Sequence, residues 1–117
     1  MKFRALYPKI LIGLIAAQFY AAGLGLFGAT TFVPHAIIGW SFILLAMALL
    51  FVALVSGRRR TLAGPALAVM LLSVSQPVIV FGLRPWPAAA AFHPVVGLII
   101  VGLLVIIVRR AGEVARA

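Results

Sequence analysis

Four long apolar runs dominate the sequence, and only short connections separate them. The runs extend over residues 10–29, 35–56, 62–83 and 93–108, and residues 88–91 are expected to extend the last one. About 20 apolar residues in a helix are enough to cross the hydrocarbon core of a bilayer. A chain in lipid must satisfy its own backbone hydrogen bonds, so each run is expected to be helical. Because short connections make successive helices antiparallel neighbours, the sequence predicts an all-α membrane protein with an up-down-up-down bundle.

The composition excludes most other classes of protein. Of the 117 residues, 66% are hydrophobic and 9% are charged, whereas soluble domains contain about half apolar and about a quarter charged residues. The absence of cysteine excludes disulfide scaffolds, iron–sulfur clusters and cysteine zinc sites. Glu113 is the one acidic residue, which excludes paired catalytic carboxylates, magnesium sites and carboxylate proton relays. No catalytic residue is assigned, a non-enzymatic role is favoured, and the length fits one domain over residues 1–117.

The net charge of +9 is distributed as in a membrane protein and not as in a nucleic-acid-binding protein. Four spans place both termini on one side of the membrane, and Arg84 is the one cation on the other side. The remaining cations are Lys2, Arg4, Lys9, Arg58, Arg59, Arg60, Arg109, Arg110 and Arg116. Because positive residues stay inside, both termini are expected in the cytoplasm, in a bacterial cytoplasmic (inner) membrane. A cleaved signal peptide is the alternative for the N-terminus, but the first apolar stretch is too long for one.

A separation of 58 residues relates two glutamines, two histidines and two glycines. The pairs are Gln18 and Gln76, His35 and His93, and Gly39 and Gly97. A repeat at one period suggests a supersecondary unit used twice, here two helical hairpins in residues 1–57 and 58–117. Parallel copies are related by a pseudo-two-fold axis along the membrane normal. The histidines are then expected on diagonal helices near the outer surface, and the glutamines on the other diagonal, nearer the midplane.

Two histidines that face each other across a helical bundle are able to hold a haem iron as axial ligands. The sequence therefore predicts one haem b between His35 and His93. Gly39 and Gly97 each follow a histidine by four residues, on the same helix face, and are expected to leave space for the macrocycle. Arg84 is expected to pair with a propionate.

Each of these residues also has a plainer interpretation. A histidine at a helix start caps the helix or contacts lipid headgroups, and glycines in membrane helices commonly serve close helix packing. Gln18 and Gln76 are expected to hydrogen-bond each other or a carbonyl across the bundle. Because the residue before a proline disfavours the helical region, His93 is expected at the N-cap of its helix. Pro77 is expected to kink the third helix.

One ordered set of residues extends over all four predicted helices. It consists of Gln18, the segment AAGLGLF at residues 21–27, His35, Gln76 with Pro77, and His93 with Pro94. Over about the whole chain, this arrangement resembles an uncharacterised bacterial family of small four-helix integral membrane proteins of unknown function. That resemblance implies the fold and no activity. More loosely, the arrangement is similar to the four-helix b-type cytochromes, and one histidine pair then implies one haem.

Three functional hypotheses follow from these patterns. The first is a haem-b protein in electron transfer or haem handling, with a redox partner. The second is a non-catalytic accessory or structural subunit of a larger membrane complex. The third is a site for a quinone or another lipophile, bounded by Trp40, Trp86 and Phe92, with a histidine hydrogen-bonded to a ligand carbonyl. The expected surroundings are the lipid bilayer and no nucleic acid, and the small-residue faces suit a homodimer.

Overall fold

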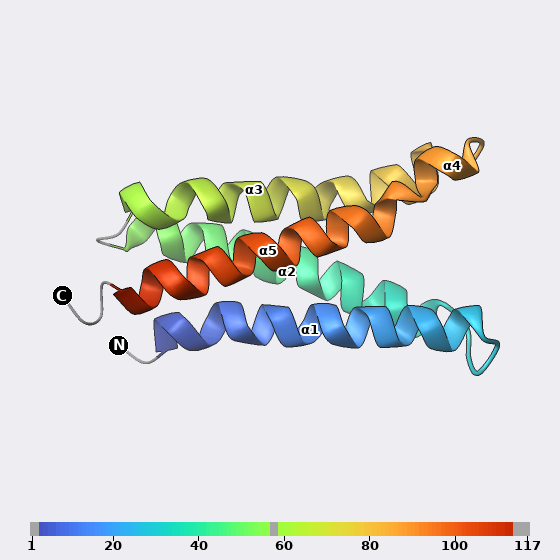
Figure 1. Cartoon of the computed structure of the whole chain (residues 1–117), viewed down its shortest axis with the longest axis horizontal. Helices are drawn as coiled ribbons and strands as arrows, with labels where there is room; N and C mark the ends of the chain where they lie inside the picture. The colour runs from blue at the N-terminus through green and yellow to red at the C-terminus, as the bar shows by residue number, and fades with distance from the viewer. Residues whose placement is uncertain (1–2, 57–58, 114–117) are drawn as a thin grey trace.

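The structure, a computed structural model, describes residues 3–56 and 59–113, and the side chains of residues 6–56 and 61–113. All secondary structure in these ranges is helical. In chain order the elements are α1 (Phe3–Leu26), α2 (Val33–Val55), α3 (Arg59–Pro77), the π-helix η1 (Val78–Gly82), the short α4 (Pro87–Ala90) and α5 (Phe92–Glu113) (Figure 1).

Within the described ranges, four segments are long and apolar enough to cross a membrane. They are Leu6–Leu26, Val33–Val55, Thr61–Gly82 and Pro87–Glu113. This result agrees with the four predicted runs and indicates a multi-pass membrane protein. Residues 88–91, predicted to extend the last run, form most of the separate helix α4 and the turn that follows it.

The predicted end of the first helix, at residue 29, is wrong, because α1 ends at Leu26. Gly28 has a φ of 74°, in the left-handed region that favours glycine. The N–H of Ala29 donates to the carbonyl of Leu24, and the N–H of Gly28 donates to that of Gly25. This pair of hydrogen bonds is the Schellman motif, in which a glycine ends a helix and satisfies its last carbonyls.

The four long helices pack in a ring. α1 and α3 each pack against both α2 and α5, whereas in the described parts of the chain no Cα atoms of α1 and α3, or of α2 and α5, come within 8 Å of each other. Each of these last two pairs therefore lies diagonally across the bundle. The start of α1 and the end of α5 lie at one end, and the α1–α2 connection and α4 lie at the other (Figure 1).

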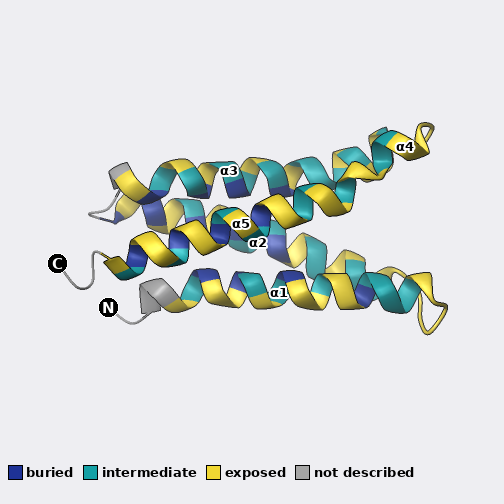
Figure 2. Ribbon diagram, in the orientation of Figure 1, coloured by how far each residue is buried: buried dark blue, intermediate teal, exposed yellow. Residues whose placement is uncertain are grey.

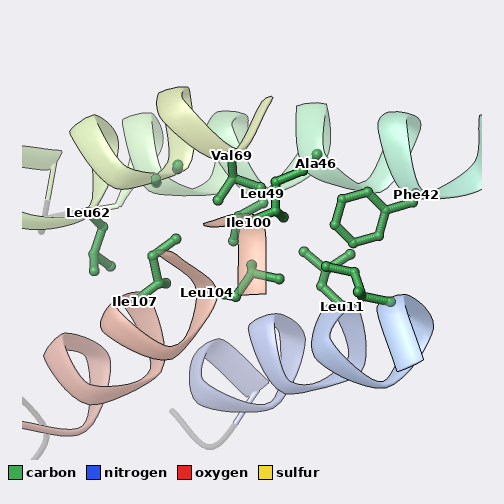
Figure 3. Close-up of a cluster of buried hydrophobic side chains, with 12 residues drawn as sticks. Leu11, Phe42, Ala46, Leu49, Leu62, Val69, Ile100, Leu104 and Ile107 are labelled. Carbon is green, nitrogen blue, oxygen red and sulfur yellow. The ribbon is translucent and has the colours of Figure 1, made fainter. Parts of the chain in front are cut away.

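The close-packed core occupies one half of the bundle. On each helix its residues recur every three or four positions, as Ile100, Leu104 and Ile107 do on α5, which is the spacing of one helix face. The cluster consists of Leu11, Ile15, Phe42, Ala46, Leu49, Ala53, Leu62, Ala66, Val69, Ile100, Leu104 and Ile107 (Figure 3). We call the half of the bundle that contains this cluster the basal half. The basic residues Lys9, Arg109 and Arg110 also lie in it.

The other half, formed by residues 18–41 and 74–99, has no comparable core, and we call it the distal half. Among its described side chains, Ala21 is the one buried residue. In Figure 2 this half is mostly intermediate or exposed, and α1 diverges from the η1–α4 region toward its end. Every duplicated glutamine, histidine and glycine belongs to the distal half.

The α-helical part of the third span, α3, ends at Pro77, and a π-helix follows it directly. The sequence predicts a kink at this residue, and the structure has the π-helix Val78–Gly82 there. A proline lacks the N–H that a regular helix needs, so the hydrogen-bond pattern must change at this point. Short π segments are rare and occur frequently at functional sites. The apolar sequence VIVFG contains no signal that distinguishes a π-helix from an α-helix.

Candidate functional site

His35 lies in the first turn of α2 and contacts α1. Pro34 precedes it within the same turn, where the preset φ of proline suits a helix start. The Nδ1 atom of His35 lies 3.0 Å from the backbone carbonyl oxygen of Gln18. The ring of Phe32 stands edge-on to the imidazole, with ring centroids 6.4 Å apart and planes at 85°. The imidazole of His35 is therefore held on two sides.

His93 is the second residue of α5, and the predicted N-cap position is wrong. Pro94 follows it in the first helical turn, where the missing N–H of proline costs no hydrogen bond, so the helix accommodates both residues. The ring of His93 lies beside the backbone of Gln76, in the same sequence relation that joins His35 to Gln18. However, its buried Nδ1 has no hydrogen-bond partner.

The rings of His35 and His93 lie next to each other. Their centroids lie 5.9 Å apart, and their planes meet at 67°, an edge-to-face arrangement. Because the backbones of α2 and α5 do not come close to each other in the described chain, the two side chains approach each other across the bundle. The structure thus brings together the two histidines that the repeat pairs.

The duplicated glycines contact neighbouring residues of α1. A Cβ atom on Gly39 would lie 2.6 Å from Nε2 of Gln18, and one on Gly97 would lie 3.5 Å from Cζ of Phe19. The space beside each glycine therefore holds an α1 side chain, which is the close packing that glycine commonly permits in membrane helices. Phe19 and Phe32 were not predicted from the sequence. Phe19 directly follows Gln18, and Phe32 precedes His35 by three residues, so their positions beside the repeated residues were a possible signal.

Unpaired polar atoms are concentrated at this site. Among the described side chains, the buried atoms without a hydrogen-bond partner are Oε1 of Gln18, Nε2 of Gln76 and Nδ1 of His93. The expected hydrogen bonds of the two glutamines are therefore missing at these atoms. An unpaired buried polar group costs about 1–3 kcal/mol, so native proteins contain few of them. Three of the four duplicated Gln and His residues carry such an atom, which makes this cluster the candidate site.

Arg84 does not join this cluster. It is exposed in the turn between η1 and α4, and forms no hydrogen bond or ion pair with the described residues. Trp86, two residues later, is also exposed. The partner expected for Arg84, a haem propionate, would belong to a bound group and not to the chain.

His35 and His93 bring two imidazoles together at the site. In the described chain, no group of three or more His, Cys, Asp and Glu side chains is placed to hold a metal. A free transition-metal ion needs more than two protein ligands, whereas a haem takes only its axial ligands from the protein, often two imidazoles on facing helices. His35 and His93 supply that number.

The fold and the site together define a multi-pass membrane protein with four apolar helices and a His–Gln cluster in the distal half. Residues 18–83 match a family of unknown function, DUF6220, and the chain belongs to this family. The matched segment contains Gln18, His35 and Gln76, and it ends before His93. No curated protein and no solved structure matches the chain.

Proposed function

We propose that this protein binds one haem b between His35 and His93 and acts in electron transfer or haem handling. The observation that carries the proposal is the 5.9 Å separation of the two ring centroids. With metal–imidazole bonds of about 2 Å, two imidazoles on opposite sides of one metal hold their centroids about 6 Å apart. The two rings thus need little change in separation to become axial ligands.

The surroundings of the histidines support a bound group. Gln18 and Gln76 lie on α1 and α3, the helices between the two histidine-bearing helices, and each presents an unpaired buried atom. The distal half lacks the close-packed core of the basal half. A bound haem supplies one-electron chemistry, and the chain supplies the axial nitrogens and an apolar enclosure in which Phe19 and Phe32 take part.

We further propose an orientation in the membrane. The basal half faces the cytoplasm, the distal half faces the outside of a bacterial inner membrane, and the helices run up-down-up-down. The exposed Lys9, Arg109 and Arg110 at the basal end support this orientation. The pairing of each histidine with the glutamine of its own hairpin supports a pseudo-two-fold relation between the hairpins.

Single cysteines test the orientation, because the chain has none of its own. In intact cells, a membrane-impermeant maleimide is expected to label Thr30→Cys, in the α1–α2 connection, and to leave Glu113→Cys unlabelled until the membrane is opened. Labelling of Glu113→Cys alone in intact cells contradicts the orientation.

A visible absorption spectrum tests the haem. The sample is detergent-purified protein expressed with ample haem, oxidised and then dithionite-reduced. A low-spin b-type spectrum is expected, and it is expected to be lost in both His35→Ala and His93→Ala, since each removes one axial ligand. A colourless protein, or a spectrum indifferent to both substitutions, contradicts the proposal.

A second candidate is a quinone or a similar lipophile with a polar head. The unpaired Oε1 of Gln18 is an acceptor and the unpaired Nε2 of Gln76 is a donor, which suits a head group with hydroxyl or carbonyl oxygens. If this candidate is right, lipid extracts of the purified protein contain a quinone in stoichiometric amount. That quinone is expected to decrease in Gln76→Leu, and colourless protein without any quinone contradicts it.

A further inference from the structure

The two histidines of the site have unequal surroundings, although the repeat relates them. His35 has a hydrogen bond to the Gln18 backbone and an edge contact with Phe32. Among the described residues, His93 has no hydrogen-bond partner at its buried Nδ1, and its aromatic contact is with His35 itself. The difference therefore lies in how firmly each ring is held before any ligand binds.

The hydrogen bond of His35 determines its tautomer. A backbone carbonyl oxygen only accepts hydrogen bonds, so Nδ1 of His35 must donate to Gln18. In the neutral ring the proton then resides on Nδ1, and Nε2 keeps its lone pair. A ring N–H donated to a carbonyl is also the arrangement that orients a metal-ligating histidine and raises its basicity.

For His93, no hydrogen bond at Nδ1 to a described residue decides which ring nitrogen carries the proton. The buried Nδ1 of His93 has no hydrogen-bond partner among the described residues, although the ring lies beside the Gln76 backbone. Its Nδ1–H and Nε2–H tautomers therefore differ less in free energy than those of His35. Among the described residues, no aromatic side chain stands to His93 as Phe32 stands to His35.

We infer that His35 is the preorganised ligand of this site, presenting Nε2 from one tautomer, and that His93 is the exchangeable ligand. The ligand roles rest on the proposed haem function, whereas the difference in tautomer does not. If a haem were bound, His35 would hold it and His93 would be the residue that gives way to a small exogenous ligand. Such an exchange would favour haem handling over simple electron transfer.

Haem retention in the two alanine variants tests the ligand roles. His35→Ala is expected to lower haem retention by more than about tenfold, since even the loss of an outer-shell partner of a metal ligand typically costs that much. His93→Ala is expected to keep its haem, with a high-spin spectrum that added imidazole returns to low spin. Equal loss of haem in both variants, or better retention in His35→Ala, overturns the inference.

A second measurement tests the tautomers without haem. In haem-free protein labelled with ¹⁵N-histidine, NMR of the ring nitrogens is expected to show one Nδ1–H tautomer for His35 and a mixture for His93. Phe32→Leu is expected to loosen the His35 ring, and Phe27→Leu, at a highly exposed position, is the matched control. An Nε2–H tautomer at His35, or the same mixture at both histidines, overturns the inference.

The two proposals fail in different ways. Wild-type protein that binds no haem contradicts the proposed function, and the ligand roles fall with it, while the NMR result still decides whether the rings differ. If haem binding depends equally on both histidines, the proposed function stands and the inference about the ligand roles is overturned.

Discussion

Gln18 contacts α2 at two points one helical turn apart. Its backbone carbonyl accepts the hydrogen bond from Nδ1 of His35, and its side-chain amide lies against Gly39, where a Cβ would approach Nε2 to 2.6 Å. One residue of α1 therefore positions the histidine and occupies the space beside the glycine that follows it. Any change at Gly39 is expected to reach the site through Gln18.

Gly39→Ala is the first variant that this relationship predicts. An added Cβ at 2.6 Å must displace the Gln18 amide, which is the far end of a flexible side chain and is able to move. We therefore expect little loss of stability in detergent, but reduced haem retention, because the displaced amide belongs to the site. The matched change, Gly97→Ala, meets Phe19 at an ordinary 3.5 Å, and the better helix propensity of alanine adds about 0.5–1 kcal/mol of stability. Equal damage by both substitutions contradicts this account.

Gln76→Leu is expected to stabilise the haem-free protein. The substitution removes the unpaired Nε2 from a buried position, and such a group costs about 1–3 kcal/mol. The same change is expected to weaken ligand retention if the amide serves the bound group. Thermal unfolding of both proteins without haem measures the first effect. A clear loss of stability in Gln76→Leu would show that the amide has a partner in the apoprotein.

Leu104→Ala tests the location of the core. Leu104 is fully buried in the basal half, and Leu98, on the same helix, is 62% exposed in the distal half. Burial of Leu in a soluble core is worth about 2–5 kcal/mol, and in lipid only the packing part remains. We therefore expect a loss of about 1–3 kcal/mol for Leu104→Ala and little change for Leu98→Ala. Denaturant-induced unfolding in micelles measures both, and a similar loss at the two positions argues against a one-sided core.

Tyr7→Phe tests an interhelical hydrogen bond in the basal half. The hydroxyl of Tyr7 donates to the carbonyl of Leu45 at 2.8 Å, joining α1 to α2. Hydrogen bonds between membrane helices contribute about 0.6 kcal/mol on average and up to about 1.7 kcal/mol. A loss within that range is expected for Tyr7→Phe and none for Tyr20→Phe, which changes an exposed side chain on α1. Unfolding of the two variants under one set of conditions decides the point.

Sequence reasoning predicted the number and approximate limits of the membrane helices, because long apolar runs have few alternatives in lipid. It placed the end of the first helix three residues too late, since an apolar run does not reveal where a glycine adopts a positive φ. Gly28 ends α1 at Leu26. The π-helix after Pro77 was not predicted either, because the local sequence is uniformly apolar.

The same reasoning singled out Gln18, Gln76, His35 and His93 from one repeated spacing, and the structure brings the two histidines together. It did not predict that Gln18 and Phe19 would occupy the space beside the glycines. Side chains of a third helix fill that space, and their register relative to α2 and α5 depends on packing that a repeat within the chain does not encode.

The sequence by itself determined that this chain is a membrane protein with four apolar helices, because hydropathy over about 20 residues is a local property. The tertiary structure alone decided that the core closes in the basal half and that unpaired polar atoms remain in the distal half. It also decided that the repeated histidines differ, one held by Gln18 and Phe32 and the other without a partner at Nδ1. Those features depend on contacts between helices far apart in the chain, where small shifts in register change which polar atoms meet.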